Sequence, residues 1–356
     1  MVGVSPTPLS CDSALAVVGD RLATELVDVT SDLAALDSSG FWAVVLPFSG
    51  PAVCARFATV RPVRPWRGAA WRGPTPSSWR SSLDRRGFEA RVGAIRSAIG
   101  AGDVYQVNLT RRLSAPAPAD ADVAALGAAL AVGNPAPFSA VVRLPAHAVH
   151  VASASPERFL SIRGRRVWSS PIKGTAATPD GFLAKDRAEN IMIVDLVRND
   201  LGRVCDWGTI RVPRLVEVET HPGLVHLVST VEGRLRPGSG WADAIGATFP
   251  PGSVTGAPKL AALDHIARLE PVDRGIYCGA VGWVDADLGQ GDLNVAIRTF
   301  WLDEGRIHFG TGGAVTWDST PAGEWAETDL KAGRLLDLAS ARPERAGHGV
   351  ARFVHG

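Results

Sequence analysis

The last third of the chain is a run of strand-like segments, and it most limits the folds that this sequence can adopt. Apolar and polar residues alternate through 276–286, 292–302 and 306–317, and the turn-rich sequences LGQG and DEG separate these segments. Short turns of this kind join antiparallel neighbours, whereas parallel strands need a long crossover. The rest of the sequence has no βαβ rhythm and no repeat with a period of about 20 to 50 residues. The sequence therefore predicts an α+β fold with antiparallel sheets.

Upstream of this run, further strand-like segments alternate with helical ones. Strand patterns occupy 41–49, 53–60, 104–113, 138–144, 147–153 and 224–235. Helical spacing of apolar residues occurs in 88–99, 121–132, 184–204 and 321–339, and a Gly/Pro-rich loop leads into another helix within 249–271.

The length of 356 residues, with 46% hydrophobic content, exceeds the usual size of one compact domain, so we expect one large domain or two closely packed lobes. Residues 64–86 are rich in Pro, Trp, Arg and Ser, as exposed connections are. We therefore predict an N-terminal lobe with its linker over 1–86, a core over 87–340 and a C-terminal tail over 341–356.

The composition favours a protein that binds a small molecule. A formal net charge of +1 and the lack of a long basic run give no electrostatic signature of nucleic-acid binding. No apolar run reaches the roughly 18 residues needed to span a bilayer, and the first residues lack the features of a signal peptide, so we expect a cytoplasmic protein without membrane contact. The cysteines form no CxxC pair and are expected in the core: Cys11, Cys54, Cys205 and Cys278.

Residues 155–175, SPERFLSIRGRRVWSSPIKGT, are predicted to place an acid and an amine on adjacent strands joined by a tight RGR turn. Glu157 is the acid and Lys173 is the amine. Only four of the 37 basic residues are lysines, so the chain uses arginine wherever charge alone is needed. A retained lysine indicates a need for a small amine that can lose its proton and attack carbon, although a structural salt bridge is the alternative.

Two helices each carry a glutamate, Glu189 and Glu327, that could hold a hard cation. Oxygen ligands without His or Cys partners suit Mg²⁺ better than zinc. The alternative is an ordinary helical ion pair at i,i+4 spacing, of Lys185 with Glu189 or of Glu327 with Lys331.

Anion-binding groups are predicted near the end of the strand-like run. The strand period places Arg298 on the same face as Asn294 and Ala296, and a half-buried guanidinium needs an anion such as a carboxylate. The backbone N–H groups around Gly312 and Gly313 could bind a second carboxylate, although glycine-rich turns are often only turns. Residue chemistry alone thus indicates a small dianion, a metal, an amine and an acid.

The ordered motifs resemble those of the chorismate-utilising enzymes. The resemblance extends over about two thirds of the chain, in family order, and it rests on these blocks: GDVYQVNLTRR, SPERF, PIKGT, KDRAENIMIVDLVRND, HLVSTVEG, PPGSVTGAPK, YCGAVGW, AIRT, GTGGAVTWDS and EWAET to Lys331. It implies a pair of facing antiparallel sheets with helices outside and an active site between the sheets. The N-terminal lobe is shorter here than in typical relatives.

Carried over residue by residue, the resemblance implies a chorismate site. Mg²⁺ would be bound by Glu189 and Glu327, with Glu324 nearby, and would hold the ring carboxylate. The second carboxylate would be bound by Arg298, Tyr277 and the amides around Gly312 and Gly313. Four further residues would complete the substrate site: Gln106, Thr175, His226 and Lys331.

Two positions choose among the reactions of the family. Relatives that add water carry a lysine where this chain has Gln106, and members with glutamine there use ammonia. The motif PIKGT with Lys173 resembles the aminodeoxychorismate synthase component I branch, whereas anthranilate synthases generally have PIAGT. This implies that Lys173 attacks ring C2, Glu157 protonates the leaving C4 hydroxyl, and ammonia then adds at C4, to supply 4-aminobenzoate and folate synthesis.

The sequence contains no GxCxGxQ block of a glutaminase, so we expect a separate glutaminase subunit to supply the ammonia. Two alternatives stay open. One is an anthranilate synthase component I, and the other is a chorismate-binding subunit without turnover.

Overall fold

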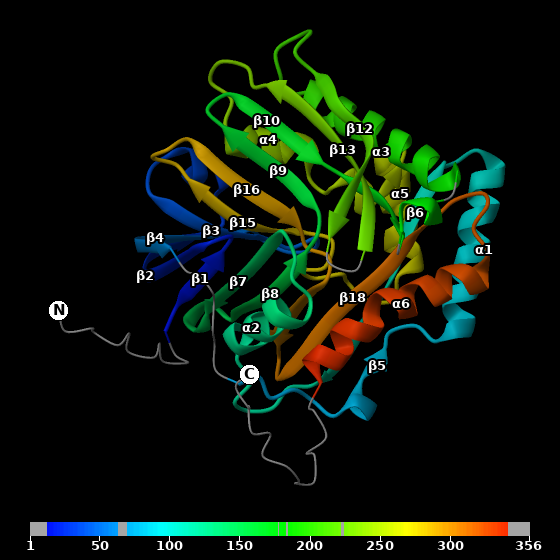
Figure 1. The fold of residues 1–356 in the computed structure, drawn as a ribbon, viewed down its shortest axis with the longest axis horizontal. Coiled ribbons are helices and arrows are strands. Elements are labelled where there is room, and N and C mark those ends of the chain that lie inside the picture. The colour runs from blue at the N-terminus through cyan, green and yellow to red at the C-terminus, as the bar shows by residue number, and fades with distance from the viewer. Residues whose placement is uncertain (1–12, 63–69, 177, 183, 222–223, 341–356) are drawn as a thin grey trace, which may run out of the picture.

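The computed structural model describes residues 13–62, 70–176, 178–182, 184–221 and 224–340 (Figure 1). This part has the predicted α+β architecture, and every strand pairing in it is antiparallel. The strands are β1 (Leu15–Val18), β2 (Arg21–Thr30), β3 (Phe41–Leu46), β4 (Val53–Pro62), β5 (Arg80–Ser81), β6 (Gln106–Pro116), β7 (Phe138–Leu144), β8 (Val149–Ser155), β9 (Arg158–Arg163), β10 (Arg166–Ser170), β11 (Ile172–Ala176), β12 (Arg211–His221), β13 (Leu224–Arg234), β14 (Gly256–Ala257), β15 (Ala280–Asp285), β16 (Gln290–Val295), β17 (Thr299–Asp303) and β18 (Arg306–Val315). The α-helices are α1 (Arg85–Ala101), α2 (Val123–Gly133), α3 (Ala184–Gly202), α4 (Trp241–Thr248), α5 (Lys259–Leu269) and α6 (Pro321–Ala339).

The strands form one hydrogen-bonded ribbon with two halves. The first half runs in the order β12, β13, β10, β9, β16, β15, β3, β4, β2. The second runs β1, β7, β8, β17, β18, β6, and the pairing of β1 with β2 joins the halves. Two short links, 156–157 and 296–298, carry the chain between the halves, and each holds a residue predicted to be functional, Glu157 or Arg298.

The two halves face each other across the main apolar core, which confirms the predicted pair of facing sheets. Val142 of β7 and Val151 of β8 belong to one buried cluster with Val281 of β15 and residues of β3 and β16. Asn294 of β16 also bridges the halves, because its Nδ2 donates to the Phe138 carbonyl of β7 at 2.7 Å. Burial of these apolar faces provides the main driving force for closing the ribbon.

The helices cover the outer faces. Helices α2 and α6 pack over β1, β7, β17 and β18 in a second cluster, and α1 and α5 pack over β6 in a third. Figure 1 shows α6 lying along β18 with α1 beside it. Helix α3 packs against β11 and β13. No helix within the described residues is long and apolar enough to cross a membrane.

Most predicted elements are found, with informative differences. No sequence pattern indicated β1, β2, β5, β12, β14 or α4. The predicted strand 292–302 is two strands, because the chain leaves β16 at Val295 and enters β17 of the other half at Thr299. Within the predicted linker, Trp71 and Trp79 bond to the end of α6 rather than lying free. Strands of the predicted N-terminal lobe pair with strands of the predicted core, as β1 does with β7 and β3 with β15. The predicted domain boundaries stay predictions. The predicted C-terminal tail, 341–356, lies outside the described residues.

Candidate active site

Glu157 lies in the link between β8 and β9, where the chain passes from one sheet half to the other. The Ser155 hydroxyl fixes its backbone by accepting from the Glu157 N–H at 3.2 Å and donating to the Val295 carbonyl at 2.6 Å. The side chain is buried and lines a small cavity together with Ser253. Burial raises the pKa of Glu157 to about 7, although polar groups of Ser253 and Ile172 and the charges of Lys173 and Lys331 oppose the rise. A carboxyl group of this kind suits proton transfer near neutral pH.

Lys173 interacts electrostatically with the Glu157 carboxyl. It lies on β11, however, and not on the second strand of the hairpin, where the sequence predicted it. The tight turn is present, since Arg166 pairs with Arg163 in the β9–β10 hairpin. That hairpin ends at Ser170, however, and β11 pairs with β13 instead. The register shifts between Lys173 and Thr175, where Gly174 has φ +83°. Such bulges redirect side chains. Lys173 interacts electrostatically with Glu157.

Helix α6 gathers three of the predicted site residues beside the glycine-rich end of β18. A Cβ atom on Gly313 would lie 2.8 Å from Glu324 Oε2 and 3.5 Å from Glu327 Oε1, so only glycine allows both carboxylates to approach the strand. Lys331 Nζ lies 2.6 Å from Glu327 Oε1 and donates to the Gly312 carbonyl at 3.0 Å. Lys331 also acts electrostatically on Glu157. Lys331 therefore pairs with Glu327 and lies within electrostatic range of Glu157.

Glu189 is half-buried on α3, a helix that a neighbouring side chain fixes in place. Asn190 is fully buried, donates its Nδ2 to the Leu227 carbonyl of β13 at 3.0 Å, and accepts from Ser229. Among the described residues, no group of three or more His, Cys, Asp or Glu side chains is close enough to hold a metal ion. The structure thus brings Glu324 and Glu327 together but does not gather Glu189 with them.

Arg298 lies in the second link between the halves, not on a strand face as predicted. Its φ of +52° is unusual for a residue other than glycine, and such conformations occur preferentially at functional sites. Its carbonyl accepts from Ala154 N–H at 3.0 Å, which holds the corner against β8. Burial lowers the pKa of the guanidinium, and no carboxylate in the described part of the chain forms an ion pair with it. A half-buried guanidinium in this situation can bind an anionic ligand.

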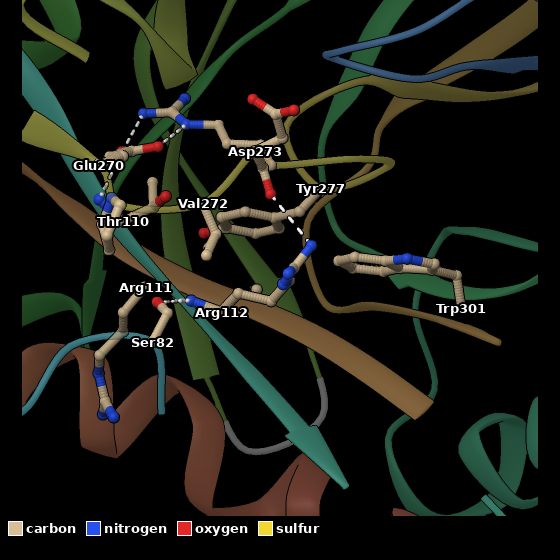
Figure 2. A pocket seen from close by; sticks show the side chains of 12 residues that line it. Ser82, Thr110, Arg111, Arg112, Glu270, Val272, Asp273, Tyr277 and Trp301 are labelled. Atoms are coloured by element: carbon tan, nitrogen blue, oxygen red, sulfur yellow. Dashed lines mark hydrogen bonds and ion pairs between the residues drawn. The ribbon is translucent and has the colours of Figure 1, made fainter. Parts of the chain in front are cut away.

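Tyr277 precedes β15 and is buried against the glycine strand. Gly310 leaves room for its ring, because a Cβ there would lie 2.0 Å from the tyrosine Cγ. Burial raises the pKa of Tyr277 well above its ordinary value, so the phenol is a hydrogen-bond donor at neutral pH. Figure 2 shows the ring in a small polar pocket, where Arg112 donates to the Asp273 carbonyl and Glu270 accepts from the Thr110 N–H. Glu157 and Lys173 do not line this pocket.

The remaining predicted ligands lie on buried strands. Gln106 is fully buried at the start of β6, and neither polar atom of its amide has a hydrogen-bond partner among the described residues. An unsatisfied buried amide is costly, so a water molecule or a ligand is expected beside it. His226 is buried on β13, where its backbone is in register with Thr175. The side chain of Thr175 lies outside the described residues.

Four residues that support the site were missed from the sequence: Ser155, Asn190, Ser253 and Arg274. Arg274 is 3% exposed, forms an ion pair with Glu270 at 2.7 Å and donates to the Val254 carbonyl at 2.7 Å. The first three lie inside the blocks SPE, AEN and PPGSV, so position within a motif was the available signal. Arg274 lies outside every block, and nothing in the sequence marked it.

The chain matches the family model of the chorismate binding enzymes over residues 67–337. It is 41% identical over 272 residues to aminodeoxychorismate synthase component 1 of Klebsiella aerogenes, covering 73% of this chain and 59% of that one. It is also 41% identical over 283 residues to anthranilate synthase component 1 of Streptomyces coelicolor, covering 75% and 54%. The chain therefore spans between half and two thirds of the length of these relatives.

Solved structures show the same fold at low sequence identity. Anthranilate synthase component I from Streptococcus pneumoniae superposes with a TM-score of 0.75 at 24% identity, covering 94% of each chain. The menaquinone-specific isochorismate synthase MenF from Escherichia coli gives a TM-score of 0.76 at 18% identity, covering 92% of this chain and 88% of that one.

Proposed function

The chain belongs to the chorismate binding enzymes, and on that premise we propose that it is an aminodeoxychorismate synthase component I, converting chorismate and ammonia to 4-amino-4-deoxychorismate. The observation that carries this proposal is the electrostatic interaction of Lys173, in its PIKGT motif, with the buried acid Glu157. A lysine in this position offers a nucleophile that can direct nitrogen to C4.

In the proposed reaction, the neutral amine of Lys173 forms a bond to ring C2. The two ring double bonds shift towards C4, and the C4 hydroxyl leaves as water with the proton of Glu157. Ammonia then bonds to C4, the double bonds shift back and the bond from C2 to Lys173 breaks. The proton lost by the added nitrogen returns to Glu157, so the enzyme ends in its starting state.

We propose that the two carboxylates of chorismate bind to different groups of residues. Arg298 would offer its guanidinium and Tyr277 its phenol O–H to the enolpyruvyl carboxylate. The backbone amides near Gly312 and Gly313, which lie on β18, would add further donors. Gln106 would contact the incoming ammonia, since its buried amide lacks a protein partner in the described chain.

The ring carboxylate is assigned to Mg²⁺ held by Glu327 and Glu324 of α6, and we propose that Glu189 of α3 joins these two carboxylates only when the metal binds. The pair on α6 fits a hard cation, because both carboxylates converge beside Gly313. Bound Mg²⁺ would withdraw electron density from the ring through that carboxylate. The ammonium of Lys331 already lies against Glu327 Oε1, which indicates that this oxygen attracts a cation.

Product analysis tests the function against its alternatives. We expect chorismate, Mg²⁺ and ammonium to give 4-amino-4-deoxychorismate without release of pyruvate, as followed by chromatography and mass spectrometry. Anthranilate synthase activity is the second candidate, because a relative of that name is equally identical to this chain. Pyruvate formed in proportion to the chorismate consumed would establish that alternative, and binding of chorismate without turnover would indicate a silent subunit.

Nitrogen supply gives an independent prediction. We propose that ammonia comes from a separate glutaminase, as the name component 1 of a relative suggests, since this sequence has no GxCxGxQ block. The purified chain should therefore use ammonium at alkaline pH, where free ammonia is abundant, and should not use glutamine. Turnover with glutamine, measured as glutamate release by the chain alone, would contradict this prediction.

A further inference from the structure

We infer that Asn108 is a second binding residue for ammonia, and that its side-chain amide and that of Gln106 together hold the nucleophile on the inner face of β6. The inference rests on the proposed function, which gives this contact to Gln106 alone. It adds a residue that determines which nucleophile the site accepts.

Gln106 and Asn108 carry several buried amide atoms without partners. Gln106 is 0% exposed and Asn108 is 7% exposed. Nε2 and Oε1 of Gln106 and Oδ1 of Asn108 each lack a hydrogen-bond partner among the described residues. Other buried atoms of this kind, such as Asn134 Nδ2, occur one to a residue and not on neighbouring side chains of one strand. A buried amide without a partner is unfavourable, so these two side chains require a bound polar molecule.

Both side chains point to the face of β6 that is turned away from helices α1 and α5. Val107 and Leu109 belong to the buried cluster under those helices. Successive side chains of a strand alternate between its two faces, so Gln106 and Asn108 share the opposite, inner face.

The inner face also carries a group that is assigned to the substrate. Asn108 pairs with Ala314 of β18. Gly310 lies four residues before Ala314 on the same face of that strand, and it makes room for the ring of Tyr277. The two amides therefore lie on the sheet face that Tyr277 covers, and the proposed function assigns Tyr277 to a chorismate carboxylate.

The backbone of this part of β6 is held on both sides. The Asn108 N–H donates to the Thr255 carbonyl at 2.8 Å, and Arg274 Nη2 donates to the Asn108 carbonyl at 3.0 Å. Arg274 is itself buried and forms an ion pair with Glu270. The strand that carries the amides is therefore in place before a ligand binds, as a preorganised binding site requires.

The chemistry of these amides fits ammonia. A carbonyl oxygen accepts an N–H, and it leaves the lone pair of the nitrogen free to attack C4. The ligand must be small, because both side chains are buried, and the neutral amides give no charge that would select an anion. Neither amide can take a proton from water, whereas ammonia is a nucleophile in its neutral form. The pair should therefore select ammonia over water.

Steady-state kinetics test the role of Asn108. Asn108→Leu keeps the branching of the side chain and removes both polar amide atoms. We expect it to raise the KM for ammonia by about five- to tenfold, the effect of one lost hydrogen bond, and to leave the KM for chorismate within about twofold. Thr110→Val, an isosteric change at the next buried position on the same face, is the matched control and should not change the KM for ammonia.

If Asn108→Leu does not fold, Asn108→Ala removes the same polar atoms without added volume. A rise in the KM for ammonia no larger than that of Thr110→Val would overturn the inference. An equal rise in the KM for chorismate would do the same, because it would indicate a general disturbance of the site.

A titration of the free protein tests the site without turnover. In protein with ¹⁵N-labelled side-chain amides, the two signals are assigned by their loss in Gln106→Leu and Asn108→Leu. We expect ammonium chloride at alkaline pH to shift both signals with one common midpoint, and sodium chloride at equal ionic strength to shift neither. In Asn108→Leu, the midpoint of the Gln106 signal should move to about five- to tenfold higher ammonia.

The two measurements separate the inference from the proposed function. Amide signals that do not respond to ammonia would identify water as the bound molecule and would overturn the inference. An inactive wild type whose amide signals respond to ammonia would support the inference and overturn the proposed function alone.

Discussion

Lys173→Ala is expected to lower the rate of 4-amino-4-deoxychorismate formation by about a thousandfold or more, because it removes the proposed nucleophile. Without that amine, nothing else in the site forms a bond to C2, and ammonia has no intermediate that directs it to C4. Lys173→Arg should be equally poor, since a guanidinium stays protonated and cannot attack carbon. Residual activity of Lys173→Ala should turn towards addition at C2 with release of pyruvate, because its site then reads PIAGT. The measurement is separation and mass analysis of the products.

The covalent step gives this prediction a second readout. A chorismate analogue with a leaving group placed for attack at C2 should add its mass to the peptide that contains Lys173, and Lys173→Ala should lose the adduct. Lys185→Ala, at another of the four lysines, serves as a control that should keep both the adduct and the activity. Wild-type rates of 4-amino-4-deoxychorismate formation in Lys173→Ala would mean that the lysine is only structural or electrostatic.

Much of the fold follows from local patterns in the sequence. Helix α6 has the bounds that its periodicity predicts, because Thr320 accepts from the Gly323 N–H as its N-cap and a proline occupies its first turn. The β9–β10 hairpin lies where its two-residue turn predicts, with Arg163 and Arg166 in register. Both elements can be predicted because the residues that determine them lie within the element or directly beside it in the sequence.

Long-range geometry could not be predicted in the same way. The alternation in 292–302 continues through a corner, and nothing in a two-residue period reveals that Arg298 has a positive φ or that the strand changes sheets. Ser253 lines one small cavity with Glu157 although the two are distant in sequence, and Arg274 holds its turn through the Val254 carbonyl. Such contacts depend on the closure of the ribbon, which no local propensity encodes.

Residue chemistry alone also left the metal site undecided between a Mg²⁺ ligand and a helical ion pair at Glu327. The structure contains the ion pair, since Lys331 Nζ lies 2.6 Å from Glu327 Oε1, and it also contains Glu324 beside the same glycine. The two interpretations are compatible, because an ammonium can occupy the position of a cation until the metal and the substrate bind. A measurement of Mg²⁺ binding therefore decides whether Glu327 is a metal ligand.

Glu327→Gln and Glu189→Gln are each expected to lower turnover about a hundredfold or more at limiting Mg²⁺ and to weaken Mg²⁺ binding measured by calorimetry in the presence of chorismate. Loss of one negative ligand weakens a hard-cation site directly, and the amide cannot replace the lost charge. Folding should be retained, because the Glu327 side chain is 42% exposed and Glu189 is only half-buried.

The control is Asp337→Asn, an exposed acid on α6, the helix that carries Glu327, and it should change neither binding nor rate. It separates the loss of a ligand from the loss of one negative charge on the helix. High Mg²⁺ should partly restore Glu189→Gln, because α6 keeps two converging carboxylates beside Gly313. Wild-type activity of either glutamine variant at limiting Mg²⁺ would exclude that glutamate from the metal site. If that residue were Glu327, its carboxylate would be only the ion-pair partner of Lys331.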